Sequence, residues 1–493
     1  MSDTAAPQAE RERRPVWSVL RLSWPAATSY LLNNTYRIND QFWVQDLGAS
    51  AQAAMGATLF VLIAQFALIY LACGGALSLV AQAKGAGEPG EMDRVSRHSL
   101  LLGLLLSGGL AASGPFVTGP IVELLGLRAE AADFAVLYLG GIFQMVPFLT
   151  LAAVVDHLLI GRGNSLAPML LQALAVVVNF ALNPLLIYGT QAAQVVEDVP
   201  ALAPLGRAAS ACAESFGIEG RGLYGAALAT GLSRLASSAL GLFVLWRLFG
   251  LRLWGRGRPR LPLLGRIVSI SAPVSLSIAT YGGVYWAILA LVLARLEPEV
   301  TAGLGLGFQI FEGVVFPTYL GVSMAGATLV GQRVGARDPE GARQILHAAR
   351  GVARCLGALA TLAFLFGAAG LARHFTSDEA VLAETVHYVH LLAWSQYFVA
   401  LQVVDEKALL GAAHSRPIVW ITTSGDLLRV PLSYLLALSL GWGASGVWWA
   451  INLTTYYKAG LLRLEVSRGR WLQQALRPEP VAEPSAHEHT ERP

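Results

Sequence analysis

Long apolar runs separated by short polar loops repeat from one end of the chain to the other. A helix needs about 20 residues to cross the hydrocarbon core of a bilayer, and twelve runs reach that length. They span residues 17–46, 52–83, 98–125, 131–160, 167–189, 222–249, 264–296, 301–332, 346–371, 383–411, 417–441 and 443–465. Most runs lack the polar stripe at helical spacing that a soluble helix shows. The pattern predicts an all-α polytopic membrane protein with twelve transmembrane helices.

Composition supports a membrane protein and excludes other classes. Of the 493 residues, 55% are hydrophobic and 14% are charged, whereas soluble domains carry about 25% charged residues. The net charge of +3 comes from short loops rather than a compact basic domain, so we expect no nucleic-acid partner. Cys73, Cys212 and Cys355 lie far apart in the sequence, which indicates neither a disulfide framework nor a metal cluster.

Charged residues in the loops predict the orientation. Basic loops alternate with neutral or acidic loops, and the N-terminal arm is basic. The basic loops are 84–97, 161–165, 247–260, 332–343, 414–417 and 463–471. Because cytoplasmic loops are enriched in Lys and Arg, we expect these loops and both termini to face the cytoplasm. No cleaved signal peptide is evident. The long loop from Gly189 to Arg221 lies on the outer side and is predicted to be solvated, with at most a short helix.

The chain also contains an internal duplication. VVD at 154–156 recurs at 403–405, Gly85 and Pro89 recur as Gly335 and Pro339, and Pro25 recurs as Pro273, each shifted by 248 to 250 residues. A constant shift near half the chain predicts two six-helix halves. Since six is even, the halves insert the same way up, as in parallel transporter repeats. The predicted divisions are an arm (1–16), an N-terminal lobe (17–249), a basic linker (250–263), a C-terminal lobe (264–465) and a polar tail (466–493).

The first apolar run contains a polar cluster, NNTYRINDQFW at 33–43. On a helix, Asn33, Tyr36, Arg37 and Asp40 share one stripe. A carboxylate facing lipid costs several kcal/mol, so we expect the stripe to face the protein interior. One interpretation is an Arg37–Asp40 pair that only neutralises itself. The other is that Asp40 titrates or binds a cation, with Arg37 tuning its affinity.

Other charged residues within the runs have two interpretations each. Glu312 lies deep in the eighth run without a local cation. It is either a residue that lines a cavity and meets a cationic substrate, or a protonated, hydrogen-bonded acid. Arg234, and Asp426 with Arg429, are interpreted as structural pairs or as snorkelling groups.

Asp156 and Asp405 are equivalent by the repeat and lie near the cytoplasmic ends of their runs. A pair of Asp156 with Arg162, or of Asp405 with neighbouring charges, would be structural. A gate between the two halves is the related functional role. We favour local pairing or a gate over a role in ion coupling.

Several motifs in order resemble a known family. The first run with Asp40 is followed by LGASAQAAMG. Further motifs follow in the order in which the family has them. They are LVAQAKGAGEPGEMDR and its copy LVGQRVGARDPEGAR, LIGRGNSLAP, VNFALNPLLIYG, GLYGAALATGLSR and GWGASGVWWA. Across about residues 17–470, this set is similar to the multidrug and toxic compound extrusion (MATE) family of the multidrug/oligosaccharidyl-lipid/polysaccharide exporter group.

The resemblance implies a transporter without a cofactor. Two six-helix lobes would form a V that opens alternately inward and outward. The protein would exchange bulky, often cationic, small organic molecules for Na⁺ or H⁺. It would work as a monomer surrounded by lipid in a bacterial inner membrane.

The resemblance also implies site residues. Tyr36, Asp40, Asn179 and Thr230 match the cation-coupling positions of the family, and Asn183 replaces an Asp. Asn179 and Asn183 are four residues apart and share a helical face. Because Asp40 beside Arg37 and two amides offers little negative charge, H⁺ is the expected ion at Asp40 rather than Na⁺.

The second half departs further from the family. Tyr281 stands where some members carry a Glu, and Val399 lies near the place of a missing Asp. Ion coupling is therefore expected in the N-terminal half. Tyr281, with Glu312, Asn33 and Arg37, is a candidate for lining the substrate cavity or tuning the site.

Two alternatives were weighed. A flippase for lipid-linked saccharides belongs to the same exporter group, but such proteins often have fourteen spans and a strongly basic cavity, and this chain has few internal arginines. An intramembrane enzyme is the third hypothesis. The sequence has no HExxH, no GxSxG and no paired Asp motif within a run.

Overall fold

The computed structural model describes residues 15–251 and 260–475. Nearly all of the predicted arm (1–16), most of the linker (250–263) and the end of the tail (466–493) lie outside these ranges. No strand occurs among the described residues.

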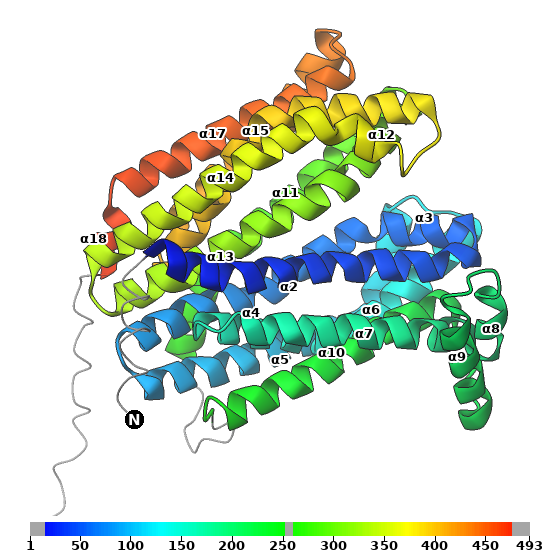
Figure 1. Ribbon diagram of the computed structural model, residues 1–493, viewed down its shortest axis with the longest axis horizontal. Helices are drawn as coiled ribbons and strands as arrows, with labels where there is room; N and C mark the ends of the chain where they lie inside the picture. Colours follow the sequence, from blue (N-terminus) through cyan, green and yellow to red (C-terminus); the bar gives the residue numbers. More distant parts are fainter. Residues whose placement is uncertain (1–14, 252–259, 476–493) are drawn as a thin grey trace, which may run out of the picture.

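Twelve long helical segments make up the described chain (Figure 1), in agreement with the twelve predicted runs. In the first half they are α2 (Pro15–Val44), α3 with α4 (Ala49–Ala57 and Leu59–Gly85), α5 (Pro89–Leu124), α6 (Ala129–Gly161), α7 (Leu166–Tyr188) and α10 (Gly222–Arg247). In the second half they are α11 (Leu261–Leu291), α12 with α13 (Pro298–Gly307 and Gly313–Gly335), α14 (Pro339–Ala372), α15 (Glu379–Gly411), α16 (Arg416–Tyr434) and α17 (Ala444–Ser467). A π-helical turn (Phe308–Glu312) joins α12 to α13, another (Leu435–Ser439) extends α16, and the short α18 (Arg470–Ala475) follows α17.

Eight of these segments are long and apolar enough to cross a membrane by length and composition. The four others are α2, α15, α16 and α17. They carry more polar side chains, many of which are buried, such as Asp40 in α2 and Asp405 in α15. These buried polar groups therefore face other helices, where they are kept from lipid.

Prolines and carboxylates set the starts of the helices that follow the repeated loops. Pro89 and Pro339 occupy the first turns of α5 and α14, where the fixed φ of proline suits a helix and its missing N–H costs nothing. The Asp338 side chain also accepts a hydrogen bond from the backbone N–H of Gly341 at 2.8 Å. These local features explain why the loop motif is repeated in both halves.

The helices of the first half lie together in Figure 1, and those of the second half lie beside them. The two groups meet where α2 packs on α13 and α4 packs on α11. At the end near α18 the two groups lie close together, whereas α3 and α12 at the other end lie apart in this view. The division into lobes at 17–249 and 264–465 stays a prediction.

Two equivalent glycines make the closest contact between the halves. A Cβ atom on Gly85 would lie 1.8 Å from the carbonyl oxygen of Gln332, and one on Gly335 would lie 1.9 Å from that of Gln82. Any side chain at either position would overlap backbone, so only glycine fits. The Gln82 amide also donates to the carbonyl of Gly411 at 3.0 Å. The duplicated motif thus forms a reciprocal contact between α4 and α13.

The long loop from Gly189 to Arg221 is more ordered than predicted. Its residues form α8 (Ala192–Val195) and the 14-residue helix α9 (Ala203–Phe216). Ala209 and Ala213 of α9 are buried, and the Ser210 hydroxyl accepts a hydrogen bond from the N–H of Ala193 at 2.9 Å. The small residues that suggested a solvated loop instead allow α9 to pack closely.

Candidate functional site

Asp40 lies in a polar pocket formed by α2, α7 and α10. Its side chain is nearly fully buried. One carboxylate oxygen accepts hydrogen bonds from the amides of Asn179 at 3.0 Å and Asn183 at 2.9 Å. The other accepts a hydrogen bond from the Thr230 hydroxyl at 3.0 Å. Three uncharged donors from two other helices therefore hold the carboxylate.

A second set of contacts surrounds these donors. The Tyr36 hydroxyl donates to the backbone carbonyl of Thr230 at 3.0 Å and is hydrogen-bonded to the Ser233 hydroxyl. The Asn39 amide donates to the Asn179 side-chain oxygen at 2.6 Å. All five residues predicted for ion coupling therefore lie in one pocket. Asn39 is an addition that the sequence analysis missed, although it precedes Asp40 directly.

The Asn183 side-chain oxygen is the open group of the pocket. It is buried and has no hydrogen-bond partner among the described residues. Buried polar atoms are nearly always paired, so this oxygen is an acceptor that stays available beside the Asp40 carboxylate's own donors. Among the described residues, no group of three or more His, Cys, Asp or Glu side chains is arranged to hold a metal ion.

The Arg37–Asp40 pair, one of the two interpretations of the polar cluster, does not form. Arg37 is exposed, and none of the hydrogen bonds to Asp40 comes from it. Arg234 approaches the pocket instead, with its guanidinium carbon 4.6 Å from the Tyr36 ring centroid. Arg234 follows Thr230 by four residues and so lies on the same helical face. That spacing is the signal from which the sequence could have placed Arg234 at this pocket.

Arg234 connects the pocket to Asp156. Its guanidinium donates to the side-chain oxygens of Asn33 at 2.6 Å and Gln172 at 2.5 Å. The Gln172 amide in turn donates to the Asp156 carboxylate at 2.7 Å. Of the two predicted roles, the contacts agree with a structural pairing of Arg234 rather than with snorkelling, and Asn33 belongs to the same network.

The predicted pair of Asp156 with Arg162 is wrong. Arg162 bonds Asp93 at 3.3 Å and the Ser96 hydroxyl at 2.9 Å, both on α5. Asp156 and Arg162 are six residues apart, whereas side chains meet on one helical face at spacings of three or four. Arg162 therefore reaches a neighbouring helix.

Asp405 forms a buried ion pair with Arg350 of α14 at 2.6 Å. Lys407 pairs with Glu406 at 2.9 Å. The predicted pairing of Asp405 with its sequence neighbours is therefore wrong, because Lys407 pairs with Glu406 and the partner of Asp405 comes from another helix.

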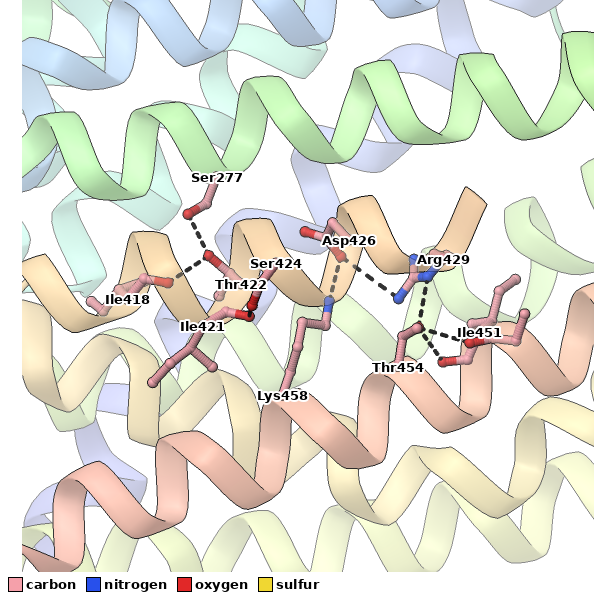
Figure 2. A network of polar contacts seen from close by, with 11 residues as sticks. Ser277, Ile418, Ile421, Thr422, Ser424, Asp426, Arg429, Ile451, Thr454 and Lys458 are labelled. Carbon is pink, nitrogen blue, oxygen red and sulfur yellow. Dashed lines mark hydrogen bonds and ion pairs between the residues drawn. The ribbon is translucent and has the colours of Figure 1, made fainter. Parts of the chain in front are cut away.

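The second half contains a charged cluster on α16 and α17 (Figure 2). Asp426 accepts a hydrogen bond from the Lys458 ammonium at 2.7 Å and lies 3.7 Å from a terminal nitrogen of Arg429. The Arg429 Nε donates to the Thr454 hydroxyl at 3.0 Å. The predicted Asp426–Arg429 pair is present. Lys458 was missed because periodicity within one helix says nothing about side chains that arrive from another.

Glu312 and Tyr281 lie on the same side of the molecule as this cluster. Glu312 accepts a hydrogen bond from the Tyr388 hydroxyl at 2.8 Å, as the interpretation of a hydrogen-bonded acid expects. The Tyr281 and Tyr285 ring centroids are 4.7 Å apart, and the Arg429 guanidinium carbon is 5.6 Å from the Tyr285 centroid. Tyr281 is thus part of an aromatic group beside Arg429.

These features define the class of protein, a polytopic helical membrane protein with separate polar sites in its two halves. A model of the MatE family matches residues 25–185 and 273–435, once in each half. The chain belongs to the MatE family, so it is a membrane transporter of small molecules and not an enzyme.

Relatives and solved structures agree. The chain is 29% identical over 462 residues to a probable multidrug resistance protein NorM of Bradyrhizobium diazoefficiens, covering 90% of this chain and 91% of that one. It is 26% identical to the multidrug resistance protein PmpM of Pseudomonas aeruginosa, covering 80% of each. A structure titled as an outward-facing multidrug resistance MATE family transporter matches with a TM-score of 0.81 at 20% identity, covering 94% of this chain and 97% of that one.

Proposed function

We propose that this protein exports organic compounds by alternating access in exchange for a cation that binds at Asp40. The observation that carries the proposal is a buried carboxylate whose direct partners are all uncharged. Asp40 can gain or lose a proton without breaking an ion pair. The names of the relatives support multidrug export and give no support to a lipid-linked saccharide flippase.

The coupling ion is H⁺. The groups around Asp40 point hydrogens at it, because two amides and one hydroxyl donate to its oxygens. A hard cation such as Na⁺ needs oxygen atoms directed at it, so both amides would have to turn. A proton on Asp40 needs only one acceptor, and turning the Asn183 amide alone would bring its unpaired oxygen to the carboxyl group.

The protein works as a monomer in a bacterial inner membrane with both termini in the cytoplasm. The alternation of basic and acidic loops supports this orientation. The two family matches support a division into two six-helix lobes that rock against each other.

This function is tested in everted membrane vesicles. The readout is the accumulation of ethidium inside the vesicles. Asp40→Asn keeps the size of the side chain but cannot ionise, and an NH₂ group replaces one of its two accepting oxygens. We expect the variant to lose transport driven by a proton gradient, by a factor of ten or more on the scale expected for an essential group, while the folded protein is retained.

The control is Asp198→Asn, because Asp198 is exposed in the outer segment and should not affect transport. A proton uncoupler should stop wild-type transport, and a Na⁺ gradient at constant pH should not drive it. Wild-type rates in Asp40→Asn, or transport that follows Na⁺ and ignores the uncoupler, would contradict the proposal.

A further inference from the structure

The internal repeat assigns each residue of the Asp40 pocket a counterpart in the second half. Helices α2 and α11 align at the shift of Pro25 to Pro273, and Val19, Ser23 and Tyr36 then fall on Ile267, Ser271 and Val284, all of them buried. In this register the counterpart of Asp40 is Ile288, which is 1% exposed.

Helices α7 and α16 align through the serines that precede them, Ser165 and Ser415. The buried positions of the two helices then coincide. The coincident pairs are Gln172 with Thr422, Ala175 with Gly425, Asn179 with Arg429, Asn183 with Ser433, and Ile187 with Ala437. The two amides that hold the Asp40 carboxylate thus correspond to a guanidinium and a hydroxyl.

Helices α10 and α17 align through Gly225 and Gly446. A Cβ on Gly225 would meet the backbone of Leu186, and one on Gly446 would meet the backbone of Leu436, which is the counterpart of Leu186. In this register Thr230 corresponds to Ile451, so the third donor to the carboxylate is also lost.

The second half therefore keeps donors at two of the three donor positions, Arg429 and Ser433, but it lacks the carboxylate that would accept from them. One terminal nitrogen of Arg429 and the Ser433 hydroxyl are both buried and have no hydrogen-bond partner among the described residues. Arg429 is 2% exposed and Ser433 is 0% exposed. Leaving such donors unpaired is costly, and a carboxylate is the group that their counterparts in the first half bind.

The charges around Arg429 leave room for an acid. Asp426 is shared between Lys458 and Arg429 (Figure 2), so these three groups carry one net positive charge. Glu312 also interacts electrostatically with Arg429, but its carboxylate accepts the Tyr388 hydroxyl on another helix. Arg429 therefore has no acid of its own that engages all of its donors.

We infer that Arg429 and Ser433, whose buried donors lack partners among the described residues, form a subsite for the carboxylate of an organic substrate. Tyr285 lies against the guanidinium, and Tyr281 against Tyr285, and both tyrosines are partly exposed. They form an aromatic edge through which a ring-bearing acid reaches Arg429. This inference rests on the proposed export of organic compounds. It adds that the substrates of the transporter include aromatic acids and zwitterions.

The test uses the full chain in lipid nanodiscs and a matched pair of probes, 2-naphthoate and its methyl ester. Wild-type protein should bind the acid at least about tenfold more tightly than the ester, because hydrogen bonds to a charged group are lost in the ester. Arg429→Gln should remove this preference, and Ser433→Ala should reduce it, with ester binding unchanged in both.

Ile288→Asp is the sharpest variant, because it restores within the chain the carboxylate that the second half lacks. The new side chain should occupy Arg429 and Ser433, abolish the preference for 2-naphthoate and leave ester binding intact. Ser424→Ala is the control, since Ser424 lies on the exposed face of the same helix and should retain the preference.

Ethidium transport separates this inference from the proposed function. Ethidium carries no carboxylate, so Arg429→Gln and Ile288→Asp should lower its transport far less than they lower the binding of 2-naphthoate, and Ser424→Ala should transport it at the wild-type rate. If ethidium is not transported by the wild type, the proposed export fails while the binding experiment still stands. The carboxylate subsite would be overturned if the wild type bound the acid and the ester equally. It would also be overturned if both variants lost ester binding and ethidium transport together with acid binding.

Discussion

The buried acids of this protein are of two kinds. Asp405 and Asp426 each pair with a cation, Arg350 and Lys458 respectively. Asp40, in contrast, is held by uncharged donors. Removing one partner of a buried ion pair leaves an uncompensated charge, so paired acids resist protonation changes. Asp40 lacks that constraint, which suits a group that must pick up and release a cation in each cycle.

Asn183 offers a direct test of why H⁺ is the coupling ion. Asn183→Asp puts a second carboxylate next to Asp40, since the Asn183 amide lies 2.9 Å from it. Two carboxylates supply the anionic oxygens that a hard cation prefers. We expect ethidium transport by this variant to respond to a Na⁺ gradient at constant pH, which the wild type should not do.

Asn39→Asp provides the comparison for this experiment. It adds the same charge to the pocket, but the Asn39 amide contacts Asn179 rather than Asp40. A smaller Na⁺ response is expected. If Asn183→Asp shows no Na⁺ response in vesicles while it still transports with a proton gradient, the ion preference is not set by the charge of the pocket.

At the scale of helices, the sequence predicted what depends on length and periodicity. The twelve spans follow from the cost of placing unpaired backbone in lipid, and Asn179 with Asn183 share a face because they are four residues apart. Contacts between helices were not predictable in the same way. Arg234 reaching Gln172, and Lys458 reaching Asp426, depend on how neighbouring helices are rotated, which a single sequence does not specify.

The contact of α4 with α13 gives a prediction about helices. Gly85→Ala would place a methyl group 1.8 Å from the Gln332 carbonyl oxygen, so the two helices must move apart. Forcing extra atoms into a packed contact costs about 1–3 kcal/mol. We expect Gly85→Ala to have a lower midpoint of thermal unfolding in detergent than the wild type. The midpoint of Gly335→Ala should fall by a similar amount, because its methyl group would meet Gln82.

Gly90→Ala is the matched control for these variants. Gly90 lies in α5 close to the same loop, and a Cβ there would meet no atom within 4 Å. Its thermal midpoint should stay at or above that of the wild type, because alanine favours a helix over glycine. Equal midpoints for Gly85→Ala and Gly90→Ala would show that the reciprocal glycine contact does not hold the halves together.

For the whole molecule, the duplication has produced two unlike sites from one ancestral arrangement. The first half holds a carboxylate with neutral donors, and the second half holds donors without that carboxylate. A transporter with this asymmetry can separate ion coupling from recognition of an acidic substrate. The direction of transport then depends on which end of the helices faces the cytoplasm, which makes orientation in the membrane part of the mechanism.

Cysteine labelling tests that orientation. Glu88 lies in the basic loop between α4 and α5, and Glu214 lies on α9 within the long loop from Gly189 to Arg221. Both side chains are exposed. In a background with Cys73, Cys212 and Cys355 replaced, Glu214→Cys should react with a membrane-impermeant maleimide in intact spheroplasts. Glu88→Cys should react only after permeabilisation, because Lys and Arg retain its loop in the cytoplasm. The opposite pattern would place the termini outside and reverse the direction in which a proton gradient drives the exchange at Asp40.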